Sequence, residues 1–325
     1  MARADLLLSI VKAARRGDQA LLERTIEALI AEERAKHHHV LADRLEESLR
    51  SNGTMVAGQR AVSAPGASGD LVIEIEPRRA LATLVLPELV SQVVNELIEE
   101  QQRADLLRAY NLEPRHRVLL TGPPGNGKTS LAEALAEALM SPLLVVRYDA
   151  VVGSFLGETA TRLRKMLESV RTRRCVLFFD EFDAIGKERG DVHETGEIKR
   201  VVSSLLLQLD ALPSYVVIVA ASNHPELLDR AVWRRFQVRL NLPAPTPAQI
   251  EAWVSSLQRR LETPLGVSGR TVATALSGAS FAELEQWSLD VQRQWIMHGA
   301  DTPLSEIAKA RLKQWRARLK VKGRA

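Results

Sequence analysis

Apolar residues recur at helical spacing through the first fifty positions of the chain. Leu6, Leu7 and Ile10 begin the first apolar stripe, and similar stripes follow up to residue 49. Three- and four-residue spacing of this kind is typical of amphipathic helices, so we predict a small N-terminal helical domain over residues 1–50. Residues 51–70 are rich in Gly, Ser and Ala and lack such a period, which predicts a flexible linker.

Short apolar runs then alternate with helical patterns up to about residue 245. A strand-like stretch comes first near residue 71, and the predicted strands that follow cover residues 118–121, 143–148, 175–179 and 215–221. The predicted helices cover residues 89–109, 128–140, 159–170 and 197–209. This alternation predicts an α/β domain over residues 71–245, with a parallel sheet sandwiched by helices. Beyond a run of prolines only helical patterns remain, which predicts a C-terminal helical lid over residues 246–325.

Composition narrows the class of protein. The chain has 325 residues, which favours more than one compact unit. No apolar stretch approaches the roughly 20 residues needed to cross a bilayer, so we expect no membrane span. The N-terminus lacks a small-residue cleavage site, and Cys175 is the only cysteine, so no internal disulfide can form. These features predict a cytoplasmic protein.

The formal net charge of +4 is unevenly distributed. Eight cationic residues and no acid lie between Lys309 and the C-terminus, so the remainder of the chain is acidic. The high isoelectric point therefore describes a basic C-terminal helix and not a basic surface on the whole protein.

One motif between a predicted strand and a predicted helix matches GxxxxGK[ST], the phosphate-binding P-loop. Glycines allow backbone N–H groups to surround phosphates, Lys128 would neutralise them, and Thr129 would offer its hydroxyl to Mg²⁺. The motif therefore predicts ATP and Mg²⁺ as cofactors and a P-loop NTPase fold. The predicted nucleotide-binding residues are Gly122, Pro123, Pro124, Gly125, Asn126, Gly127, Lys128, Thr129 and Ser130.

Polar residues end two further predicted strands. Asp180 and Glu181 follow an apolar run, where a buried strand tolerates carboxylates only beside a cation or solvent. We expect Asp180 to hold Mg²⁺ with Thr129, and Glu181 to act as general base on the attacking water. Asn223 ends the next strand and is placed to orient that water.

Together these motifs resemble the ATPase module of the AAA family, within the AAA+ superfamily. The resemblance covers residues from about 85 to 300 and includes the segment 228–236. It implies that Arg234 and Arg235 reach the γ-phosphate held by a neighbouring subunit, where a guanidinium stabilises charge on the transferring group. This chain departs from the family pattern at Phe281 of the lid, where glycine is usual.

The resemblance also extends to a glycine-flanked loop with an aromatic and an aliphatic residue, Phe155 and Leu156. It implies a homo-oligomeric ring, a hexamer, whose pore loops grip a protein substrate and remodel, unfold or disassemble it. Stand-alone bacterial proteins of this kind imply a separate subtilisin-like serine protease as partner and a role in phage defence.

Two alternative functions remain open on the sequence alone. The basic C-terminal helix is compatible with a nucleic-acid-associated ATPase, whose affinity would fall steeply with salt. An ATP-dependent signalling scaffold would depend on Arg234, Arg235 and the N-terminal domain while tolerating the loss of Phe155.

Overall fold

The computed structural model describes residues 71–147, 156–185, 204–261, 263–298 and 303–322. All of these described residues belong to one compact unit. The predicted N-terminal domain and linker (1–70) and the predicted pore-loop residue Phe155 lie outside the described residues. Among the described residues, no helix is long and apolar enough to cross a membrane.

A six-stranded sheet forms the centre of the described α/β region, in the order β1-β3-β4-β5-β2-β6. The strands are β1 (Val72–Ile75), β2 (Arg117–Thr121), β3 (Leu143–Val146), β4 (Cys175–Phe179), β5 (Val216–Ser222) and β6 (Val238–Asn241). The mixed α/β architecture with a mostly parallel sheet confirms the predicted fold class. Two details differ from the prediction, because β1 pairs antiparallel with β3 at one edge and β6, which was not predicted, pairs parallel with β2 at the other.

Alternation along the strands divides the sheet into two buried faces. In β4, Leu177 and Phe179 enter one core, whereas Val176 and Phe178 enter the other. Successive side chains of a strand point to opposite faces, so a continuous apolar run is the expected sequence of a strand covered on both sides.

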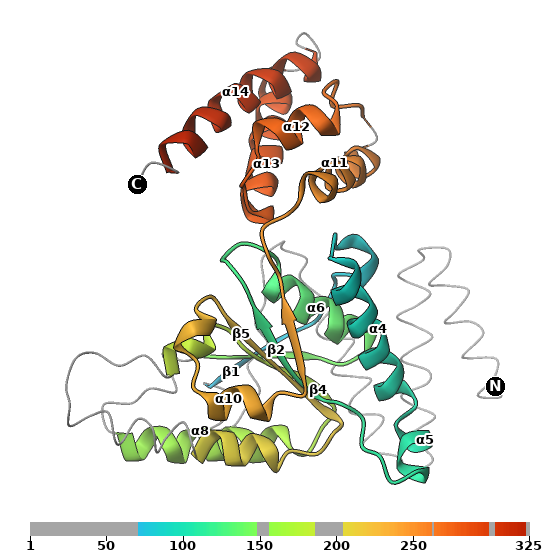
Figure 1. Ribbon diagram of the computed structural model, residues 1–325, viewed down its shortest axis with the longest axis vertical. Helices are drawn as coiled ribbons and strands as arrows, with labels where there is room; N and C mark the ends of the chain where they lie inside the picture. The colour runs from blue at the N-terminus through green and yellow to red at the C-terminus, as the bar shows by residue number, and fades with distance from the viewer. Residues whose placement is uncertain (1–70, 148–155, 186–203, 262, 299–302, 323–325) are drawn as a thin grey trace, which may run out of the picture. The chain divides into compact units, whose positions relative to one another are not determined.

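Helices cover both faces, with α4 and α6 on one side of the sheet and α8 and α10 on the other (Figure 1). Their bounds are α4 (Glu88–Gln102), α5 (Ala104–Ala109), α6 (Lys128–Ala138), α8 (Leu156–Val170) and α10 (Arg230–Arg235). The single helix predicted over 89–109 is wrong, because the chain breaks at Arg103 between α4 and α5. Leu156 was expected in a loop and is instead the first residue of α8.

The C-terminal region is helical and has its own core. Its helices are α11 (Pro247–Leu261), α12 (Gly269–Ala275), α13 (Phe281–His298) and α14 (Leu304–Lys322). Trp287 of α13 is completely buried, and Trp315 of α14 donates its Nε1–H to Asp290 Oδ2 at 3.0 Å. The basic helix α14 is thus packed onto the lid through its apolar side.

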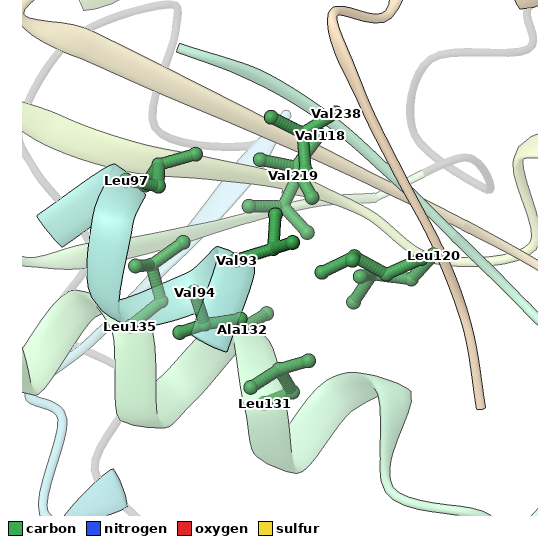
Figure 2. Close-up of a pocket in the computed structure, with 11 residues that line it drawn as sticks. Val93, Val94, Leu97, Val118, Leu120, Leu131, Ala132, Leu135, Val219 and Val238 are labelled. Atoms are coloured by element: carbon green, nitrogen blue, oxygen red, sulfur yellow. The ribbon is translucent and has the colours of Figure 1, made fainter. Parts of the chain in front are cut away.

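A small cavity of about 10 Å³ lies between α4, α6 and the sheet. Figure 2 shows that its wall is made of aliphatic side chains, among them Val93, Leu97, Leu120 and Val219. A space of this size holds about one water molecule, and an apolar wall offers water no partner. The cavity is therefore a packing gap, and the functional site lies elsewhere.

Candidate functional site

A much larger cleft, of about 670 Å³, opens where three neighbouring strands end. Strands β4, β5 and β2 are adjacent and parallel, so their carboxyl ends meet at one edge of the sheet. The P-loop (122–129) follows β2, the Asp180–Glu181 pair follows β4, and Asn223 follows β5. Ligands of open α/β sheets bind at this edge, and the volume is that of an ordinary small-molecule site.

The P-loop takes its shape from glycines in left-handed conformations. Gly122, Gly125 and Gly127 have φ values of 133°, 78° and 88°. A Cβ on Gly122 would lie 2.2 Å from the carbonyl oxygen of Leu242, whereas one on Gly127 would meet nothing within 4 Å. Gly122 therefore permits close approach of two backbones. Residues 124–130 line the cleft, whereas the predicted contacts Gly122 and Pro123 do not.

Lys128 begins α6 and is almost fully buried. Its Nζ donates to the carbonyl oxygens of Gly122 at 2.7 Å and Pro123 at 3.0 Å. Burial lowers the pKa of this ammonium, and the negative charges of Asp180 and Asp183 oppose that shift. The P-loop thus holds a partly desolvated cation beside the cleft, where its charge is available to a phosphate.

Thr129 and Asp180 come together across 51 positions of the sequence, with the Thr129 hydroxyl donating to Asp180 Oδ2 at 3.2 Å. Both line the cleft. Mg²⁺ in nucleotide sites is usually held by one or two protein oxygens together with phosphates and water. This hydroxyl–carboxylate pair has the oxygen atoms that such an ion requires, and its role as the Mg²⁺ site stays a prediction.

Glu181 lines the same cleft in a strained backbone conformation. Its φ of 48° is unusual for a residue other than glycine, and its N–H donates to Asp180 Oδ1 at 3.0 Å. Backbone strain of this kind persists only where the surrounding structure holds the residue in place, and strained residues are concentrated at functional sites. The carboxylate of Glu181 is exposed to the cleft, where it could accept a proton from water.

Asn223 also lines the cleft, and a residue missed by sequence reasoning holds it in place. Asp183 is buried, and its Oδ1 accepts from Ser222 Oγ at 2.8 Å and from the backbone N–H of Asn223 at 3.3 Å. Asp183 lies two residues after Glu181 in η2 (Phe182–Ile185), so a third carboxylate close behind the acidic pair was the available signal.

The lid closes one side of the cleft. Phe281 at the start of α13 lines it, and the backbone N–H groups of Phe281 and Ala282 donate to Asn126 Oδ1 at 3.4 Å and Gly125 O at 2.9 Å. The Asn126 Nδ2 is buried and has no partner among the described residues. A buried donor without a partner is costly, and an acceptor on a bound nucleotide would satisfy it.

Other cleft residues had no predicted role. Trp253 and Arg260 of α11 line it, as do Arg78, Arg79 and Leu84 from the segment before α4. The cleft therefore has an apolar and cationic wall in addition to the acidic residues at the strand ends. The apolar side chains of this wall can pack against a neutral ring of a ligand, and the cationic side chains can pair with its phosphates.

Arg234 and Arg235 lie at the other end of the sheet. They end α10, just before β6, and β6 runs parallel to β2 with Val238 beside Val118 and Asn241 beside Thr121. Four residues of strand at about 3.3 Å each therefore separate the end of α10, which carries the two arginines, from the end of the sheet where the P-loop begins, by roughly 13 Å. Neither arginine lines the cleft of its own chain.

A parallel sheet, a glycine-bent loop leading into a helix, a buried lysine and a hydroxyl–carboxylate pair define a P-loop nucleoside triphosphatase. Residues 118–244 match the model of the family described as "ATPase family associated with various cellular activities (AAA)".

Relatives extend this match over most of the chain. An uncharacterized AAA family ATPase, y4kL, of Sinorhizobium fredii is 37% identical over 291 residues, which cover 88% of this chain and 87% of that protein. The chain belongs to the AAA family and is an ATPase.

Longer relatives share only this module. The cell division cycle protein 48 homolog of Archaeoglobus fulgidus is 33% identical over 56% of this chain and 25% of its own length. The proteasome-activating nucleotidase of Methanocella arvoryzae is 32% identical over 59% of this chain and 48% of its own length. The activities of those whole proteins therefore do not transfer directly.

Proposed function

We propose that this ATPase works as a homo-oligomeric ring, a hexamer, in which ATP hydrolysis drives the remodelling, unfolding or disassembly of a target protein. The observation that carries the proposal is the separation of Arg234 and Arg235 from the cleft of their own chain. If a cationic side chain at the far end of the sheet serves an ATP site, that site belongs to another subunit.

Within each subunit, the cleft residues take the roles that their geometry favours. Lys128 and the P-loop N–H groups hold the phosphates, and Thr129 and Asp180 hold Mg²⁺. Glu181 accepts a proton from the attacking water, which Asn223 orients. Bound Mg²⁺ supplies charge neutralisation on the phosphates.

Protein remodelling is supported by the names of relatives that share the module, which include a proteasome-activating nucleotidase and an ATP-dependent zinc metalloprotease, FtsH. In this proposal Phe155 and Leu156 contact the target in the ring pore, since an apolar contact tolerates many side chains. A separate subtilisin-like protease and a role in phage defence stay predictions.

The test is to express Glu181→Gln in the native host, purify the complex with ATP and Mg²⁺, and identify the captured molecule. We expect a defined protein that is lost when Phe155→Ala is added, and whose folding or assembly state the wild-type enzyme changes only with ATP. Glu137→Gln, an exposed glutamate on α6, is the matched control and should hydrolyse ATP at the wild-type rate. Capture that persists without Phe155 but requires Arg234 and Arg235 would favour a signalling scaffold.

A second candidate function rests on α14. Its apolar residues Leu312 and Trp315 are buried, whereas Lys309, Lys313 and Arg316 are exposed. These cations could contact a nucleic-acid backbone, in which case binding would weaken steeply between low and moderate salt. Salt-labile nucleic acid on the Glu181→Gln complex, lost when these cations are neutralised, would favour this function.

A further inference from the structure

The two arginines that end α10 are in different environments. Arg234 is exposed, and its guanidinium has no ion pair or hydrogen bond with any described residue. Arg235 is about one-third exposed, and its Nε lies 2.6 Å from Asp210 Oδ2. Successive helical residues point about 100° apart, so the two side chains cannot share one direction.

Asp210 is already engaged by a second arginine. Its other oxygen, Oδ1, pairs with Nη1 of Arg117, the first residue of β2. The Nε–H of Arg235 is close to the carboxylate but is not aimed at it, so this contact is an ion pair and not a directed hydrogen bond. One carboxylate thus bridges two guanidinium groups, an arrangement that we call the Asp210 bridge.

Backbone contacts fix the surroundings of the bridge. Gln237 follows Arg235 by two residues, and its Oε1 accepts from the N–H groups of His116 at 3.0 Å and Arg117 at 3.2 Å. Leu209, next to Asp210, is buried in the same core as Val232 of α10. The start of β2, the helical residues before Asp210 and the end of α10 are therefore held as one unit.

The bridge is partly buried, which makes it more than a surface ion pair. The side chains of Arg117, Asp210 and Arg235 are 19%, 31% and 33% exposed. Fully exposed pairs contribute little because water screens them and free side chains lose entropy on pairing. Partial burial next to an ordered backbone reduces both losses, so Arg235 is held in place and Arg234 is not.

We propose that Arg234 alone reaches the phosphate of a neighbouring subunit, whereas Arg235 is a positioning residue that the Asp210 bridge holds in its own subunit. This inference rests on the proposed ring. The ring assigns contact with the neighbouring phosphate to both arginines, whereas the inference assigns that contact to Arg234 and the positioning of α10 to Arg235. Arg235 acts by orienting the end of α10, and through it the direction in which Arg234 extends.

Lysine substitutions separate the two roles. A planar guanidinium that contacts a phosphate is poorly replaced by lysine, whereas an ion pair with a carboxylate keeps its charge. We expect Arg234→Lys and Arg234→Ala both to lower kcat for ATP by about 10³-fold, the low end of the contribution of such an arginine. Arg235→Lys should stay within about threefold of wild type, and Arg235→Ala should lose up to about a hundredfold through misplacement.

Asp210→Asn provides the second test. It should lower kcat to the level of Arg235→Ala with little change in KM, and it should have no further effect when Arg235 is already alanine. Asp105→Asn, an exposed acid paired with Arg108, is the matched control and should leave kcat unchanged. Thermal unfolding of each variant identifies any loss of kcat that comes from loss of folded protein. If Asp210→Asn fails to fold, the comparison of Arg235→Lys with Arg234→Lys still tests the inference.

Either of two results would overturn the inference: a loss in Arg235→Lys as deep as in Arg234→Lys, or an Asp210→Asn enzyme as active as wild type or more active. The ring itself is checked by mixing Arg234→Ala with Glu181→Gln subunits. Hydrolysis should return, because intact sites then face intact arginines. If hydrolysis does not return and no oligomer forms in the presence of ATP, the proposed ring is rejected together with the division of roles.

Discussion

The Thr129 hydroxyl lies 3.2 Å from Asp180 Oδ2, and this contact joins the first turn of α6 to the residue that follows β4, in the lining of the cleft. The two residues belong to separate motifs of the sequence. Their contact places two oxygen atoms next to each other in the cleft, where we propose that both hold Mg²⁺.

Thr129→Val should therefore weaken the response to Mg²⁺. The substitution keeps the shape of the side chain and removes the hydroxyl, so we expect the Mg²⁺ concentration for half-maximal hydrolysis to rise by about 10- to 100-fold. Thr129→Ser retains the hydroxyl and should remain near wild type. Steady-state ATP hydrolysis across a MgCl₂ titration measures the effect, and equal curves for Val and Ser would contradict the assigned ligand.

Gly122→Ala and Gly127→Ala should differ in stability although both positions have positive φ. A side chain costs about 1–2 kcal/mol in the left-handed conformation of Gly127, and the φ of 133° at Gly122 lies further from any region that other residues favour. At Gly122 the new Cβ would also lie 2.2 Å from Leu242 O, whereas at Gly127 it meets open space. Gly122→Ala should thus have the lower melting temperature by several degrees in thermal unfolding, and the reverse order would contradict the packing of the P-loop against residue 242.

Much of the fold could be predicted because its signals are local. Strand β4 has the predicted bounds, Cys175–Phe179, since an unbroken apolar run is what burial on both faces requires. The four-residue strand β6 was missed because alternate residues are exposed and only its pairing with β2 identifies it. A short strand at a sheet edge carries too few residues for a periodic signal.

The break between α4 and α5 had no local signal either. No glycine or proline marks Arg103, and the surrounding residues favour helix. The break lies beside distant contacts, in which the side-chain amide of Gln101 donates to the carbonyl oxygens of Arg115 and Ser214. Tertiary hydrogen bonds here override local preference.

In the candidate site too, some residues could be predicted from local motifs and others only from long-range contacts. Lys128, Thr129, Asp180, Glu181 and Asn223 could be chosen from motifs, and the structure brings all five to one cleft. The support from Asp183 and the bridge at Asp210 depend on contacts 25 to 93 positions apart, which no local pattern records. The catalytic roles of all these residues stay predictions that substitution must test.

His116 should make the protein less stable as the pH falls below about 6.5. The imidazole is buried, and burial, followed by the charge of Arg117, lowers its pKa from the ordinary value of 6.5. The unfolded chain therefore binds a proton at a pH where the folded protein still excludes it. Stability is fully present above pH 6.5 and is lost as the pH falls towards the lowered pKa, by at most about 1.4 kcal/mol per pH unit.

His116→Gln removes this titration. Urea unfolding between pH 5 and 7 should show a smaller pH dependence in the variant, while the carboxylates with lowered pKa, such as Glu100, act only at lower pH. Parallel pH profiles for the two proteins would place the titrating group elsewhere.

Cys175, the only cysteine, should report opening of the strand that carries the acidic pair. It begins β4, is 1% exposed, and burial raises its pKa to about 11. The thiolate is the reactive species, so native protein should react with DTNB only through opening or unfolding. ATP with Mg²⁺ at about 100 times its Kd stabilises the folded state by about 2.7 kcal/mol and should slow the reaction by up to about a hundredfold. Lys128→Ala should show no such protection. Fast labelling of the native wild type without ATP would contradict the burial of β4. Labelling of the wild type that is not slowed by saturating ATP would mean that β4 opens without involving the cleft.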